Sequence, residues 1–211
     1  MKNLKNTIIT HISNHIGLFL IFWFAMIAGL VCGACLTGNL NEWDISEVNG
    51  YLNGFLYASV EGGQLDYWMI FFQSLIQNLQ ILILMFIFGF SVLCIPLSVL
   101  LVAFRSAISG FAIWFFLMEY KVGGFLMIVF GLLPSVLLTF FMTVETAVLS
   151  SDNAINNMRM NRSNTRKRLI SVSTTGDYIR AYGIYLGIAV IASLIDTFYT
   201  PNILGLIFRL I

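Results

Sequence analysis

The sequence predicts an all-α integral membrane protein, a bundle of about five transmembrane helices with the N-terminus in the cytoplasm and the C-terminus outside. Two observations support this fold class. Of the 211 residues, 59% are hydrophobic and only 10% are charged, whereas soluble domains carry about 25% charged residues. Several apolar runs are also long enough to cross a bilayer, which takes about 20 helical residues. We therefore expect a single membrane domain over residues 1–211.

The first predicted span covers residues 17–36. Within it Ala25, Gly29 and Gly33 recur at every fourth position and form a face of small residues. Such a face lets two helix backbones approach closely in lipid. Packing within the chain is the simpler interpretation of this face, and homodimerisation is the alternative.

Residues 37–67 form a polar segment without Lys or Arg. It carries several acidic residues: Glu42, Asp44, Glu47, Glu61 and Asp66. Apolar residues recur in it at helical spacing, which predicts an amphipathic helix over residues 45–60.

The second predicted span covers residues 68–93 and contains a stripe of amide side chains on one face: Gln73, Gln77, Asn78 and Gln80. Amides in a membrane span should face other helices, where they find hydrogen-bond partners. Contact between helices is the simpler interpretation of this stripe, and a path for a substrate is the alternative.

The third predicted span, residues 97–118, follows a tight reversal at Pro96 and holds Arg105 among apolar residues. An arginine at this depth costs at least ~2.5–3.5 kcal/mol on insertion scales, so it should face protein or water. Gly110 lies further along the same span and is expected to help helix packing. A short turn is predicted at residues 119–124.

The fourth predicted span covers residues 125–150, with a kink at Pro134 because proline removes a backbone donor. Glu145 lies in it about 8 Å from the inner boundary, and Arg105 lies about 12 Å from that boundary, at 1.5 Å per residue. A buried ion pair between Arg105 and Glu145 is therefore expected, and Asp196, near the outer boundary, is the weaker candidate partner.

The fifth predicted span covers residues 181–200, holds Asp196 near its far end and stops at Pro201 and Asn202. Between the fourth and fifth spans, residues 151–180 are predicted to be a basic cytoplasmic loop. Its basic residues are Arg159, Arg162, Arg166, Lys167, Arg168 and Arg180.

The distribution of charge predicts the orientation. With the N-terminus inside, the cytoplasm receives Lys2, Lys5 and the whole basic loop, while only Lys121 and Arg209 lie outside. This arrangement obeys the positive-inside rule and puts the acidic segment 37–67 outside. The basic loop suits anionic headgroups, so membrane lipid is an expected partner. The net charge of +1 gives no indication of a nucleic-acid partner.

We predict no enzyme activity, cofactor or metal site. The chain contains no H-E-x-x-H sequence and no phosphate-binding glycine loop. Asp196 is the only aspartate expected inside a span, whereas an aspartyl intramembrane protease needs two.

A set of short motifs in a fixed order resembles the stage II sporulation protein M family of five-span membrane proteins. The likeness runs from the first span to Pro201. It is strongest at Gly89-Phe90-Ser91-Val92-Leu93-Cys94-Ile95-Pro96-Leu97, Phe104-Arg105, Gly110-Phe111, Gly123-Gly124-Phe125, Leu133-Pro134 and Ala192-Ser193-Leu194-Ile195-Asp196 through Pro201. Family members often carry Gln or His after the Leu-Pro pair, whereas this chain has Ser135.

The resemblance implies a non-catalytic membrane scaffold of the mother-cell septal or engulfing membrane. Such a scaffold recruits stage II sporulation proteins D and P, which remodel peptidoglycan at the septum during engulfment of the forespore. The alternative is a permease-type subunit of an ATP-driven exporter, as in circular-bacteriocin secretion or immunity, with the basic loop docking a cytoplasmic ATPase. On either interpretation we expect Arg105 to have a structural role.

Overall fold

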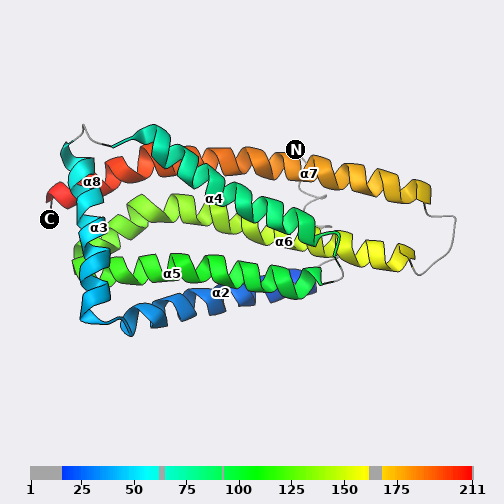
Figure 1. Cartoon of the computed structure of the whole chain (residues 1–211), viewed down its shortest axis with the longest axis horizontal. Helices are drawn as coiled ribbons and strands as arrows, with labels where there is room; N and C mark the ends of the chain where they lie inside the picture. Colours follow the sequence, from blue (N-terminus) through cyan, green and yellow to red (C-terminus); the bar gives the residue numbers. More distant parts are fainter. Residues whose placement is uncertain (1–15, 62–64, 92, 162–167, 211) are drawn as a thin grey trace.

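The computed structural model describes residues 16–61, 65–91, 93–161 and 168–210, and every element in these ranges is helical. The long helices lie lengthwise beside one another, and a further helix crosses one end of the bundle (Figure 1). The lengthwise helices are α2 (Ile16–Gly38), α4 (Tyr67–Phe88), α5 (Cys94–Leu126), α6 (Leu133–Asn161) and α7 (Arg168–Leu194). The crossing helix is α3 (Glu42–Glu61), which confirms the amphipathic helix expected over residues 45–60.

Four helical stretches of the described chain are long and apolar enough to cross a membrane: Ile16–Gly38, Tyr67–Phe88, Cys94–Ile155 and Tyr178–Leu210. The protein is therefore of the all-helical, multi-pass membrane class. The third stretch is 62 residues long and contains a reversal at Lys121, whose backbone has φ 47° and ψ −115°. Figure 1 shows α5 and α6 side by side on either side of this reversal.

The reversal between α5 and α6 is close-packed. A methyl group on Gly124 would collide with the carbonyl oxygen of Phe116, so only glycine fits there. The sequence predicted a turn at residues 119–124, and the structure confirms it.

The small-residue face of α2 packs against α5 within the same chain. A methyl group on Gly29 would collide with the carbonyl oxygen of Ala103, and one on Gly33 with that of Ala107. From the other side, Gly110 of α5 meets the backbone of Leu30 in the same way. Ala25, Gly29 and Gly33 are all buried, so this face is occupied inside the molecule.

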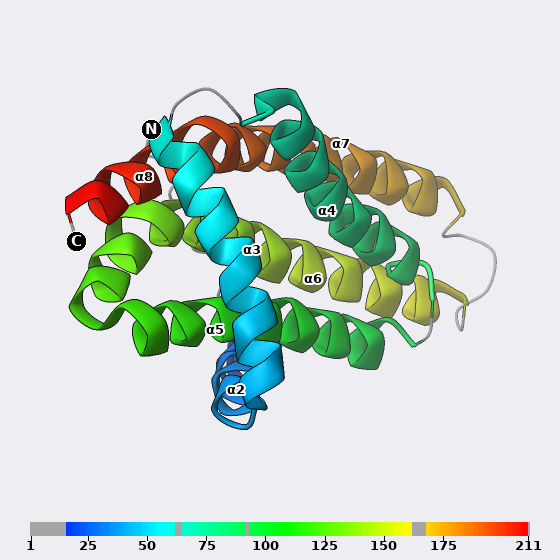
Figure 2. The same ribbon diagram turned by 60° about the vertical axis from the view of Figure 1, so that its left-hand side comes forward.

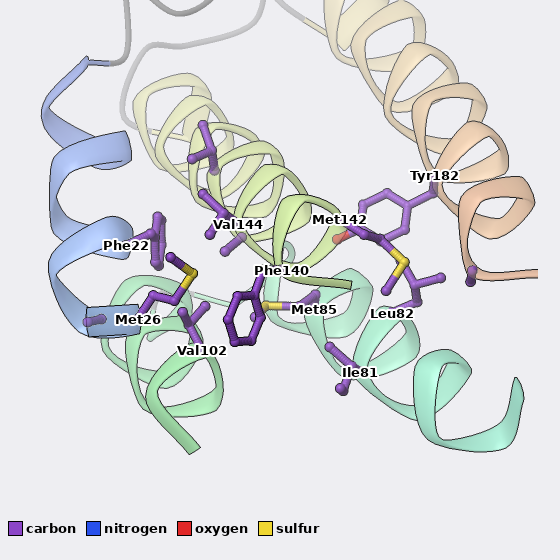
Figure 3. Close-up of a cluster of buried hydrophobic side chains, with 14 of the residues drawn as sticks. Phe22, Met26, Ile81, Leu82, Met85, Val102, Phe140, Met142, Val144 and Tyr182 are labelled. Atoms are coloured by element: carbon purple, nitrogen blue, oxygen red, sulfur yellow. The ribbon is translucent and has the colours of Figure 1, made fainter. Parts of the chain in front are cut away.

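The main core lies where α2, α4, α5, α6 and α7 meet (Figure 3). It is built from aliphatic, methionine and aromatic side chains of all five helices, including Phe22, Met26, Ile81, Leu82, Met85, Val102, Phe140, Met142, Val144 and Tyr182. The turned view shows α3 crossing the bundle (Figure 2), and a second cluster of buried side chains lies under this helix. Its centre is Leu56 of α3, which is fully buried among Phe116, Met127, Leu204 and Ile207.

Pro96 does not make the reversal expected before the third span. α4 ends at Phe88 instead of residue 93, and α5 already begins at Cys94. Pro96 therefore lies in the first turn of α5, where a missing N–H leaves no helical hydrogen bond unmade.

The irregularity expected at Pro134 takes the form of a π-helical turn, η1 (Met127–Leu132), directly before it. Pro134 is the second residue of α6. A wider turn accommodates the proline ring, which would otherwise clash with the carbonyl four residues earlier.

The prediction that Pro201 and Asn202 end the fifth helix is wrong. A second π-helical turn, η2 (Ile195–Tyr199), leads from α7 into α8 (Thr200–Leu210). Pro201 lies in the first turn of α8, where proline is tolerated. α8 is amphipathic and packs under α3, because Gly205 allows the backbone of Ser59 to approach.

The basic segment 151–180 is mostly helical, contrary to the prediction of a loop. α6 continues to Asn161, and α7 begins at Arg168. Polar and basic side chains are compatible with a helix, so the helices continue where the apolar sequence stops. Only residues 162–167 separate them, and these lie outside the described residues.

Candidate functional site

Arg105 of α5 lies at one end of a buried polar network that connects three helices. Its Nη2 donates a hydrogen bond to Oδ1 of Asn78 on α4 at 3.1 Å. Nδ2 of Asn78 in turn donates to Oγ of Ser193 on α7 at 3.2 Å. Asn78 is only 1% exposed and Ser193 is fully buried, so these bonds form in a medium of low polarity, where each is stronger than in water.

Asp196 is the acidic residue that interacts with Arg105. The two groups attract each other electrostatically, and Asp196 Oδ2 also accepts a hydrogen bond from Oγ of Ser74 at 2.7 Å. Asp196 belongs to the π-helical turn η2, and such turns recur at functional sites. We call the five residues Ser74, Asn78, Arg105, Ser193 and Asp196 the polar network.

One atom of the polar network has no partner. Nε of Arg105 is buried and lacks a hydrogen-bond acceptor within the described part of the chain. The guanidinium is therefore held through Nη2 and through its attraction to Asp196. Asn78 and Asp196 are therefore the residues that stabilise the guanidinium of Arg105.

Glu145 of α6 lies near Tyr185 of the neighbouring helix. Its carboxylate interacts electrostatically with the hydroxyl of Tyr185 on α7. The ion pair of Arg105 with Glu145 stays a prediction, since the partners that the structure gives Arg105 are Asn78 and Asp196.

The amide stripe of α4 is divided between two faces. Asn78 is buried in the polar network, but Gln73, Gln77 and Gln80 are exposed. The expectation that all four amides face other helices of the chain is therefore wrong for the three glutamines. At about 100° per residue, the apolar residues Ile81, Leu82 and Met85 share the side of Asn78. Their burial determines the rotation of the helix and turns the glutamines outward.

A second polar cluster, absent from the sequence-based predictions, caps the end of α4. Ser150 Oγ donates to the carbonyl oxygen of Met85 at 2.8 Å, and Asn153 Nδ2 donates to that of Gly89 at 3.0 Å. The hydroxyl of Tyr178 donates to the carbonyl oxygen of Phe86 at 3.1 Å. The last carbonyls of a helix lack partners in their own helix, and residues of α6 and α7 bond to those of Phe86 and Gly89. The carbonyl of Met85 already accepts from the N–H of Gly89, and Ser150 adds a second hydrogen bond.

The same cluster explains why Gly89 is a glycine. A methyl group there would collide with the hydroxyl of Tyr178. Ser150 also shares a hydrogen bond with the hydroxyl of Tyr182. A signal for the cluster was present in the sequence, because Tyr178 and Tyr182 are four residues apart and must share a helix face.

Hydroxyl groups along α6 are satisfied within their own helix. Thr139, Thr143 and Thr146 are buried, and each donates to the carbonyl four residues earlier. Ser135, at the position after Leu-Pro, is buried as well, and its carbonyl oxygen accepts from Thr139 at 3.1 Å.

Arg159 and Arg168 lie at the end of the molecule away from α3 (Figure 1). Arg159 belongs to the last turn of α6 and Arg168 is the first residue of α7, while Arg162, Arg166 and Lys167 lie outside the described residues. Across the described ranges no group of three His, Cys, Asp or Glu residues could hold a metal ion.

The fold and the polar network together define a multi-pass helical membrane protein whose half-buried charges connect its helices to one another. Residues 15–201 match the model of the stage II sporulation protein M family, and the chain belongs to this family. No curated protein and no solved structure is significantly similar to it. Family membership associates the chain with sporulation-related membrane proteins and agrees with a non-catalytic role.

Proposed function

We propose that this protein is a non-catalytic scaffold of the mother-cell septal or engulfing membrane that recruits stage II sporulation proteins D and P for peptidoglycan remodelling. In this proposal the chain crosses the membrane five times, with the reversal at Lys121 separating two of the passes. The N-terminus is cytoplasmic and the C-terminus outside. A helix of 62 residues would measure about 93 Å at 1.5 Å per residue, three times the thickness of the hydrocarbon core, which supports two passes for Cys94–Ile155.

The observation that carries the proposal is the outward side of α3. In the proposed orientation this helix lies across the outer end of the bundle, and its apolar side is buried against α5, η1 and α8. The opposite side presents exposed residues at alternating spacings of four and three: Trp43, Glu47, Gly50, Gly54 and Tyr57. Tyr57 lies at the edge of this side, where its ring also packs edge-to-face against Phe208 of α8. We call these five residues the outer face of α3.

Exposed aromatic residues support a docking role for the outer face of α3. Trp43 is 80% exposed and Tyr57 59% exposed, and large aromatic side chains are the usual anchors of protein interfaces. α3 carries Glu42, Asp44 and Glu47 and no basic residue, so a partner with a basic surface would be attracted. The partner's docking segment would lie outside the membrane, where peptidoglycan is remodelled.

The proposal is tested by recovering partners from membranes with a tagged chain. Trp43→Ala combined with Tyr57→Ala should reduce recovery of stage II sporulation proteins D and P at least about tenfold, because interface anchors contribute most of the binding energy. The matched control is Phe72→Ala combined with Ile83→Ala, two exposed residues of α4, and it should leave recovery unchanged. Full recovery with the α3 variant would contradict the proposal.

A second candidate function is a permease-type subunit that docks a cytoplasmic ATPase. The observation in its favour is that α6 and α7 extend past the ends of α4 and α5 (Figure 1), with basic residues on the extension. Replacing residues 155–175 by an uncharged helical hairpin separates the two functions. Loss of partners only with this replacement, together with co-purification of an ATPase by the unchanged chain, would favour transport over scaffolding.

A further inference from the structure

The three exposed glutamines of α4 lie near the middle of an apolar helix. Gln73, Gln77 and Gln80 follow Tyr67 by about 9, 15 and 20 Å along a helix of about 33 Å, at 1.5 Å per residue. α4 is one of the stretches that can cross a membrane. Exposed residues around the stripe are apolar: Met69, Phe72, Ile76, Ile83, Leu84 and Ile87. Three amides therefore face outward at the depth where hydrocarbon surrounds the bundle.

The lipid hydrocarbon contains no hydrogen-bond donor or acceptor for these amides. A side-chain amide carries two donors and one acceptor oxygen, and its transfer to an apolar medium without partners is unfavourable. The buried amide in the same helix, Asn78, has both of its polar atoms hydrogen-bonded. The exposed amides are explained if another helix covers them.

We propose that two copies of this protein pair in the membrane along α4, with Gln73, Gln77 and Gln80 of one copy hydrogen-bonded to the same residues of the other. An amide is complementary to itself, since it both donates and accepts. The stripe also contains no charge that would repel an identical face. Two-fold pairing brings the same surface patch of each subunit together, which an amide stripe satisfies without any other partner.

The spacing of the stripe suits this arrangement. Both copies insert in the same direction, so their α4 helices run parallel and each glutamine meets its counterpart. Separations of four and three residues are those of a helix–helix seam. The other surface suited to pairing, the small-residue face of α2, is already buried against α5. Pairing through α4 is independent of the scaffold proposed above, which depends on α3.

The first test is oxidative cross-linking in native membranes. The background carries alanine in place of Cys32, Cys35 and Cys94, the three cysteines of the chain. Gln77→Cys in this background should give a disulfide-linked product of twice the monomer mass. Ile83→Cys is the control, because it is similarly exposed on α4 but points about 120° away from Gln77 at 100° per residue. It should stay monomeric.

The second test removes the amides and keeps the shape. The triple variant Gln73→Leu, Gln77→Leu, Gln80→Leu should weaken self-association at least about tenfold, measured by energy transfer between labelled copies as they are diluted in lipid vesicles. The matched triple Gln→Asn variant retains the amides and should keep most of the association. Undiminished association of the leucine variant, no dimer from Gln77→Cys, or cross-linking of Gln77→Cys to a different protein would each overturn the proposal.

Discussion

The guanidinium of Arg105 on α5 donates a hydrogen bond of 3.1 Å to the side-chain amide oxygen of Asn78 on α4. The side-chain amide of Asn78 also donates a hydrogen bond to Ser193 of α7. Three helices that are distant in sequence are thereby linked at one level of the bundle. A charged side chain is unfavourable in lipid. Its hydrogen bond to another helix therefore helps to specify how these helices pack.

Asn78→Leu should destabilise the protein by about 2–3 kcal/mol, because it removes the acceptor of a buried guanidinium whose Nε already lacks a partner. Thermal unfolding in detergent measures the change. Phe72→Leu, on the exposed side of the same helix, should have little effect. An Asn78→Leu protein as stable as the parent would show that the hydrogen bond contributes nothing.

Arg105 and Asp196 should behave as a coupled pair in a double-mutant cycle. Arg105→Gln and Asp196→Asn each leave one uncompensated charge, whereas the double variant leaves none. We expect the double variant to be more stable than the sum of the single losses predicts, by about 0.5–3 kcal/mol. Strict additivity would mean that the two charges do not interact.

Gly33→Ala should cost about 1–3 kcal/mol, since the added methyl group has to displace the backbone of Ala107. The matched control is Gly187→Ala in α7, which has open space around the new methyl group. It should be neutral or raise stability by up to about 1 kcal/mol, the difference in helix propensity. Equal effects at both glycines would argue against close packing of α2 on α5.

Lys121→Gly should stabilise the protein by about 1 kcal/mol or more. Lys121 is the only described residue other than glycine with positive φ, and glycine adopts that conformation without steric cost. Lys121→Ala retains the Cβ atom and should not give the gain, which separates backbone strain from loss of the charge. Denaturation curves of the three proteins decide the matter, and a destabilised glycine variant would contradict the interpretation.

The helical architecture and several site residues could be predicted from the sequence, but the contacts among them could not. The spacing of Gln73, Gln77 and Gln80 placed them on one face, yet which way that face points depends on the larger apolar side of α4. In the same way, depth along the chain suggested Glu145, and less strongly Asp196, as the partner of Arg105, and the fold gives Arg105 the neighbours Asn78 and Asp196. The depth of two residues in the membrane does not say whether their helices are adjacent, and the partner of a charged side chain depends on both.

The sequence by itself determined the membrane class, the amphipathic α3 and the presence of a charge inside the third apolar run, because hydrophobicity and its period are local properties of the chain. Tertiary structure alone decided the rotation of α4 and the continuation of the chain past Pro201 into α8. Each of these depends on packing or hydrogen bonding between residues far apart in sequence. Leu56 of α3 buried among α8 residues and Tyr178 bonded to the end of α4 are contacts of this kind.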